Sequence, residues 1–259
     1  MKKLLIAALF TTGLICSTAQ QSAAHFGMLI PSQPVVTADQ KSLDLTLSFS
    51  HPFEMIGMDL PKPAEFYVLT KGKKTDLIDS LQQTTVMDHT GWQTEYQVKR
   101  PGVYHFIMQP QPYWEPAEDL FIIHYTRAII AAFGYDAGRH EAIGLPTEIV
   151  PLLRPFGNYA GNSFSGQVLL NGSPVANAEV EVEFYNKDGS LQAPSDYHIT
   201  QVVRADTNGV FSFACPVAGW WGFAALNEAD YTLKTSQGED KQVELGAVLW
   251  VYMDELRSR

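Results

Sequence analysis

Cysteine is scarce in the 259-residue chain, which contains only Cys16 and Cys215. Cys16 lies in an N-terminal segment that we expect to be removed, so the mature chain would keep one thiol and no internal disulfide. Cys215 ends an apolar segment and precedes Pro216, a setting that favours a buried structural thiol over a nucleophile. With one cysteine left, a metal site built from several thiolates is excluded.

Positive charge is also in short supply. Lysine and arginine number 18 against 28 aspartates and glutamates, which gives a formal net charge of −10 at pH 7. Such a chain offers no broad cationic surface, so we expect no nucleic-acid partner. Hydrophobic residues make up 46% of the sequence, enough to fill a conventional core, and this excludes wholesale disorder.

Apolar runs of membrane-spanning length are missing. The run at 4–15 follows Lys2 and Lys3, is too short for an anchored helix, and precedes the small residues 22–24 (SAA), which is the pattern of a cleaved secretory signal peptide. We therefore expect residues 1–24 to be removed and the mature protein to be periplasmic, with no integral membrane segment. Because that segment holds two lysines and no acidic residue, its loss changes the net charge from −10 to −12.

The familiar catalytic signatures are not present in the sequence. It contains no G-x-S-x-G, no Walker loop, no C-x-x-C and no Rossmann fingerprint. His140 and Glu141 begin like a zinc-protease helix, but Gly144 stands where the second histidine must be. The sequence therefore predicts a protein that is not an enzyme.

Alternating apolar and polar residues predict β-structure in the first half. At 41–51 the apolar positions are Leu43, Leu45, Leu47 and Phe49, and His51 ends the strand directly before a proline. Further strands are predicted at 65–69, 95–99, 102–108 and 120–130, although the apolar length of the last segment also suits a short helix.

The pattern restarts after residue 146. Strands predicted at 166–170 and 178–185 flank the turn sequence NGSP at 171–174, which is typical of a hairpin. We expect an all-β protein of two antiparallel β-sandwich domains at 25–146 and 147–259, the second prealbumin-like or regulatory-type. The first would bind metal, and the second would fold alone.

Histidines are concentrated in the first half, which holds five of the seven. Cleavage after Ala24 would make His25 the first residue, and its free amine and imidazole could then chelate one divalent ion. Cleavage two residues earlier would also leave a motif that binds copper or nickel. His51 and His124 are further candidate ligands, whereas His105 stands among residues that suggest ordinary core packing.

Seven motifs spread over the predicted mature chain resemble the periplasmic component associated with ABC-type cobalt and nickel uptake systems, a secreted family of unknown function linked to nickel transport. The motifs are HFGMLIPS at 25–32, HPFE at 51–54, PYWEPAED at 112–119, HYT at 124–126, EIVPL at 148–152, RPFG at 154–157 and GWWGFAAL at 219–226.

The resemblance implies a protein that binds Ni²⁺ or Co²⁺ and passes it to a membrane metal-uptake transporter. His25, His51 and His124 stand in the shared motifs and are the predicted metal ligands, and Cu²⁺ should also bind in vitro. Membership of the site stays open for His105, Glu54, Met58 and Glu115.

Two other functions fit the same residues. A copper enzyme could use an N-terminal histidine and a second histidine as a two-residue brace. A structural or carbohydrate-binding sandwich would need no metal at all. Oxygen consumption by the copper-loaded protein would favour the first alternative, and the absence of any metal stoichiometry would favour the second.

Overall fold

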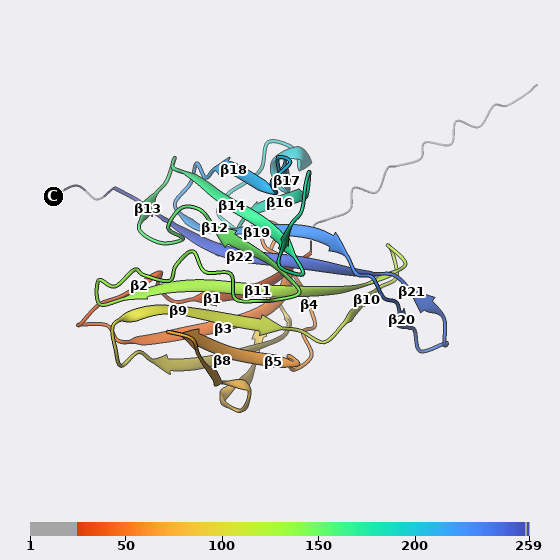
Figure 1. The fold of residues 1–259 in the computed structure, drawn as a ribbon, viewed down its shortest axis with the longest axis horizontal. Coiled ribbons are helices and arrows are strands. Elements are labelled where there is room, and N and C mark those ends of the chain that lie inside the picture. The colour runs from red at the N-terminus through yellow and green to blue at the C-terminus, as the bar shows by residue number, and fades with distance from the viewer. Residues whose placement is uncertain (1–24, 257, 259) are drawn as a thin grey trace, which may run out of the picture.

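The computed structural model describes residues 25–256 and 258. The predicted signal peptide and its cleavage site after Ala24 lie outside the described residues. The predicted all-β fold is confirmed, since the described residues form strands and two short 3-10 helices, with no α-helix among them (Figure 1).

The elements of the first half are β1 (Phe26–Pro31), β2 (Val35–Val36), β3 (Ser42–His51), β4 (Ile56–Met58), β5 (Glu65–Thr70), β6 (Lys73–Asp76), η1 (Ile78–Ser80), β7 (Gln82–Val86), β8 (His89–Gln97), β9 (Gly102–Gln109), β10 (Tyr113–Glu115) and β11 (Leu120–Ala132). Those of the second half are β12 (Thr147–Pro151), β13 (Asn158–Tyr159), β14 (Ser163–Leu170), β15 (Ser173–Pro174), β16 (Glu179–Phe184), η2 (Asp196–His198), β17 (Gln201–Arg204), β18 (Val210–Ala214), β19 (Gly219–Glu228), β20 (Leu233–Lys234), β21 (Asp240–Lys241) and β22 (Val243–Asp254).

The strands form three layers around a central sheet of eleven strands, whose main order is β17-β16-β19-β22-β11-β9-β5-β6. A five-stranded sheet, β1-β3-β8-β7 with β4, packs on one face, and a four-stranded sheet, β12-β14-β15 with β18, packs on the other (Figure 1). The chain thus builds two sandwiches that share their middle layer.

Strand β11 shows how the middle layer is buried on both sides. Its residues Ala128 and Ile130 belong to the core beneath the five-stranded sheet, whereas Ile129 and Ala131 belong to the core beneath the four-stranded sheet. A strand covered on both faces carries apolar residues at nearly every position. This explains why the sequence at 120–130 also suited a helix, although the segment is a strand.

The two halves are joined through β22, the last strand of the chain. It pairs antiparallel with β19 of its own half and parallel with β11 of the first half, in register from Phe121 with Val243 to Ala128 with Trp250. The predicted boundary after residue 146 coincides with the start of β12. Independent folding of 147–259 stays a prediction, and such a fragment would expose the edge of β22 that β11 covers.

The predicted hairpin between 166–170 and 178–185 is wrong. Across the turn, β14 pairs with only the two residues of β15, and the chain then crosses to the central sheet, where β16 pairs with β17 and β19. A turn follows β14 as predicted, but a local turn signal does not determine which sheet the next long strand joins. Cys215 is buried as predicted, and burial raises the pKa of its thiol to about 12, which makes it a poor nucleophile.

Candidate metal centre

His25 and His51 lie side by side where β1 begins and β3 ends. The antiparallel register pairs Phe26 with Ser50, so the residue before β1 comes next to the last residue of β3. The two imidazole rings have centroids 4.8 Å apart, and both side chains are largely shielded from solvent. Two of the three predicted ligands are therefore neighbours.

A carboxylate from a third strand lies next to His25. Nε2 of His25 lies 3.2 Å from Oε2 of Glu115, which is 8% exposed. Strand β10 holds Glu115 in place by pairing it with Leu120 of β11, and Oε1 of the same carboxylate accepts the N–H of Ala117. The sequence left the role of Glu115 open, and the structure places it against His25.

Burial sets the charge state of His25. Its pKa is lowered to about 4, mainly by loss of solvent and also by nearby His51, while Glu115 and Glu244 oppose the shift. The imidazole is therefore neutral at pH 7, with one ring nitrogen carrying a free lone pair. A neutral imidazole is the form that binds a metal ion.

His124 lies on β11 and is 1% exposed. Its Nδ1 accepts the backbone N–H of Gly27 at 3.3 Å, and its Nε2 lies 3.4 Å from Oε1 of Glu244 on β22. Gly246 lies directly under the ring, where any Cβ would collide with it. Both ring nitrogens thus already have protein partners. Glu244 could not be predicted as a partner of His124, because only the parallel pairing of β22 with β11 brings the two residues together.

The ring of Phe49 contacts both parts of the cluster. It stacks on His25 with centroids 5.5 Å apart and meets His124 edge-on at 5.7 Å. Tyr113 packs against Phe49 and His25. We call His25, His51, His124, Glu115 and Glu244 the histidine cluster. Within it His25 and His51 are neighbours, and Phe49 contacts the rings of both His25 and His124.

Two pairs of side chains in the histidine cluster have the separation that two ligands of one metal ion have. Two ligands held about 2.1 Å from one tetrahedral ion lie about 3.4 Å apart. The pair formed by His25 and Glu115 at 3.2 Å and the pair formed by His124 and Glu244 at 3.4 Å match that separation. In the described part of the chain, however, no three His, Cys, Asp or Glu side chains are grouped closely enough to hold an ion. A three-ligand site is therefore not preformed by side chains alone.

His105, whose membership of the site the sequence left open, belongs to a different cluster. Its Nδ1 lies 2.7 Å from Nη2 of Arg127, which also donates to the carbonyl of Glu141, while Nη1 donates to Glu148 at 3.2 Å. Glu148 accepts further N–H groups from the chain at 143 and 144, and Nε of Arg127 has no hydrogen-bond partner among the described residues. The pKa of His105 is lowered to about 3, mainly by burial and also by the Arg127 charge.

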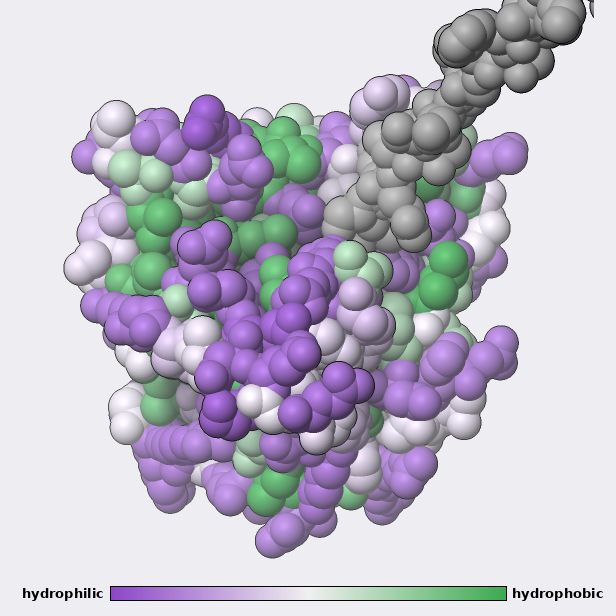
Figure 2. Space-filling view, turned by 90° about the vertical axis from the view of Figure 1, so that its right-hand side faces the viewer, coloured by the Kyte–Doolittle hydropathy of each residue, from purple (hydrophilic) through white to green (hydrophobic). Residues whose placement is uncertain are grey.

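Of the other two open candidates, Glu54 lines a separate cavity beyond the end of β3, and Met58, which pairs with Phe49, packs at the edge of the first core. The face at the right of Figure 1 is largely hydrophilic, with small, separate hydrophobic patches (Figure 2). None of the described helices has the length and hydropathy needed to cross a bilayer.

Fold and site together define an all-β protein with a buried cluster of imidazoles and carboxylates. The chain belongs to the family described as Domain of unknown function (DUF4198), whose model matches residues 22–229. No curated protein matches the sequence.

Solved structures resemble the chain only weakly. Dimeric latent PorU from Porphyromonas gingivalis aligns with a TM-score of 0.24 at 10% identity. The alignment covers 92% of this chain and 21% of the PorU chain. The major pilin subunit BcpA of Bacillus cereus has a TM-score of 0.21 at 11% identity, covering 90% and 66%. A tandem of titin Ig domains has a TM-score of 0.18 at 12% identity, covering 90% and 100%. Likenesses at this level carry no functional argument.

Proposed function

We propose that the mature protein is a periplasmic binding protein for a divalent transition metal, Ni²⁺ or Co²⁺, and that it delivers the ion to a membrane uptake transporter. The observation that carries the proposal is the pairing of His25 and His51, with Glu115 on His25 and the His25 imidazole held neutral by burial. Imidazole and carboxylate together suit late first-row divalent ions.

Cleavage after Ala24 would supply the missing donor. The new amine of His25 would belong to the same residue as its imidazole, so the two nitrogens could chelate one ion, and His51 could add a third nitrogen from the neighbouring strand. Such a set of a few nitrogens with an exchangeable position suits a carrier that must release its cargo.

Charge and sequence resemblance support the transport role. A net charge of −12 after cleavage favours capture of a cation from dilute solution, although it also serves solubility. The delivery step rests on the motifs at 25–32, 51–54, 112–119 and 124–126, which resemble those of cobalt and nickel uptake components.

The test is calorimetric titration of Ni²⁺ into protein secreted from its own precursor, after intact mass has shown loss of residues 1–24. We expect one ion per chain, and we expect one residue added before His25 to weaken binding tenfold or more. His198→Ala is the matched control, because His198 is exposed and lies in the second half. Binding that is unchanged by the added residue, or a mature chain that begins at Ala19 or Gln20, would contradict the proposal.

The same preparation discriminates the alternatives. Copper should bind most tightly in vitro whatever the natural cargo, following the general order of divalent ions. Consumption of oxygen or peroxide by the copper-loaded protein with a reductant would instead favour a copper enzyme. A protein with no metal stoichiometry would favour a structural or carbohydrate-binding role.

A further inference from the structure

The loop that follows His51 is held by the second half of the chain. Residues 52–55 connect β3 to β4, whose first residue, Ile56, pairs with His51. Met55 in this loop has a φ of 60°, a left-handed conformation that side-chain-bearing residues rarely adopt. The position of His51 at the end of β3 therefore depends on whatever holds this loop.

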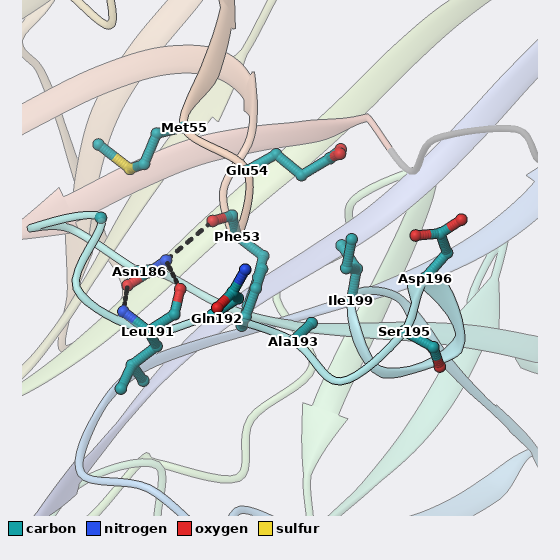
Figure 3. A pocket seen from close by; sticks show the side chains of 11 residues that line it. Phe53, Glu54, Met55, Asn186, Leu191, Gln192, Ala193, Ser195, Asp196 and Ile199 are labelled. Atoms are coloured by element: carbon teal, nitrogen blue, oxygen red, sulfur yellow. Dashed lines mark hydrogen bonds between the residues drawn. The ribbon is translucent and has the colours of Figure 1, made fainter.

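Asn186 provides two of the contacts. Its backbone N–H donates to the carbonyl of Pro52 at 3.2 Å, and its side-chain Nδ2 donates to the carbonyl of Phe53 at 3.2 Å. The same side chain is fixed by two bonds to Leu191, one donated and one accepted, as Figure 3 shows. Asn186 is 4% exposed, so water does not readily replace these bonds.

Glu183 provides the third contact. Its Oε2 accepts the N–H of Phe53 at 3.3 Å, and its Oε1 accepts the hydroxyl of Thr200. Glu183 is 1% exposed on β16 of the central sheet, where burial raises the pKa of its carboxyl to about 7. A buried carboxyl is costly, and here its hydrogen-bonding capacity is directed at the loop.

Packing alone does not fix this loop. A cavity of about 380 Å³ lies between Phe53, Glu54 and Met55 on one side and the segment from Asn186 to Ile199 on the other (Figure 3). Beside this open space, the three polar contacts to residues 52 and 53 hold the loop in addition to the pairing of β3 with β4.

We propose that Asn186 and Glu183 are positioning residues for the metal site, holding the loop after His51 so that its imidazole stays beside His25. The inference rests on the proposed function for its consequence in metal binding, but the placement of His51 can be measured without metal. Through Asn186 and Glu183, the second half of the chain would help to position a ligand of the metal site.

The experiment compares full mature chains carrying Asn186→Ala, Glu183→Leu or Glu183→Gln. Glutamine keeps an acceptor for Phe53 and offers an NH₂ to Thr200, so it should preserve the loop, whereas leucine removes both bonds. Asn227→Ala is the matched control, since Asn227 is a buried asparagine whose own bonds go to Thr147 and Ala225.

Three readouts are recorded: the Ni²⁺ affinity, the ring resonances of His51 in metal-free protein, and the exchange rate of the Phe53 amide. We expect Asn186→Ala and Glu183→Leu to shift the His51 resonances, speed Phe53 exchange tenfold or more, and weaken Ni²⁺ binding about 10- to 100-fold. Glu183→Gln and Asn227→Ala should resemble the parent in all three.

The outcomes separate this inference from the proposed function. Unmoved His51 resonances and parent-like Phe53 exchange in Asn186→Ala and Glu183→Leu overturn the positioning role, whatever the metal result. If the parent binds no Ni²⁺ but these signals move as expected, the metal-binding proposal fails while the placement of His51 by Asn186 and Glu183 is supported.

Discussion

Two buried histidine clusters lie on opposite faces of the central sheet, and they are built differently. His124 and Arg127 are three residues apart on β11, so their side chains point to opposite faces. The His124 side holds the histidine cluster, in which imidazoles and carboxylates meet. The Arg127 side holds the cluster formed with His105 and Glu148, in which a guanidinium donates to both partners.

The difference teaches which buried histidine is available to a ligand. Arg127 supplies the positive charge that Glu148 requires and a donor for His105, so that cluster balances its own charges. The charged or titratable groups that act on His25 are His51, Glu115, His124 and Glu244, and no arginine or lysine is among them. We interpret the first cluster as structural and the second as a site for a cation.

The largest expected effect is on stability at the Arg127 cluster. Arg127→Met should lower the free energy of unfolding by about 3–5 kcal/mol, because it leaves the Glu148 carboxylate buried without its partner. Denaturant unfolding measures this cost. The double variant Arg127→Met/Glu148→Gln removes the stranded charge and should recover part of the loss. A loss of less than about 1 kcal/mol in the free energy of unfolding of Arg127→Met would contradict the structural role of the Arg127 cluster.

The next effect separates the two clusters by metal affinity. His51→Ala and His124→Ala should each weaken Ni²⁺ binding about tenfold or more, which is about 1.4 kcal/mol. His105→Phe should bind Ni²⁺ within about twofold of the parent, because Arg127 keeps its bonds to Glu148 and Glu141. Calorimetry on folded variants measures all three. Equal weakening by His105→Phe would mean that the clusters do not differ in the way described.

A third effect is the pH dependence of metal binding. With the His25 pKa at about 4, its imidazole does not compete for protons above about pH 5, whereas a free amine near pKa ~8 must lose one proton to bind. Affinity should therefore fall about tenfold per unit as pH drops from about 7.5 to 6. The variant with one residue before His25 should lack this one-proton dependence. An identical slope in the two proteins would show that the amine is not a ligand.

The smallest expected effect is optical. Trp114 and His124 line the same cavity of about 210 Å³, with Phe49 and Tyr113 in its wall. Bound Ni²⁺, Co²⁺ or Cu²⁺ should therefore quench part of the Trp114 emission. Trp114→Phe should lose that quenching while binding Ni²⁺ like the parent. Undiminished quenching in Trp114→Phe would assign the signal to another tryptophan and place the ion elsewhere.

Local periodicity was enough to predict one of the two strands that bring His25 and His51 together. The alternation in β3 and the position of His51 before Pro52 placed that histidine at a strand end. Strand β1, which runs antiparallel beside it, is buried at nearly every position and carries no alternation from which its pairing could be predicted.

The long-range partners could not be predicted in the same way. Glu244 reaches His124 only because β22 pairs in parallel with β11, 120 residues earlier, and Asn186 reaches Phe53 across 133 residues. Continuous apolar strands such as β11 and β22 carry no alternation to show which face is which. The motif at 112–119 made Glu115 a candidate, but its burial depends on the pairing of β10 with β11, which the motif does not predict.

The most direct test of the central claim is the position of the ion. Crystals of the mature chain, grown with equimolar Ni²⁺ and measured at the nickel absorption edge, should show one anomalous peak about 2.1 Å from the nitrogens of His25 and from an imidazole nitrogen of His51. A peak only at exposed His89 or His198, or no peak at stoichiometric nickel, would contradict the account.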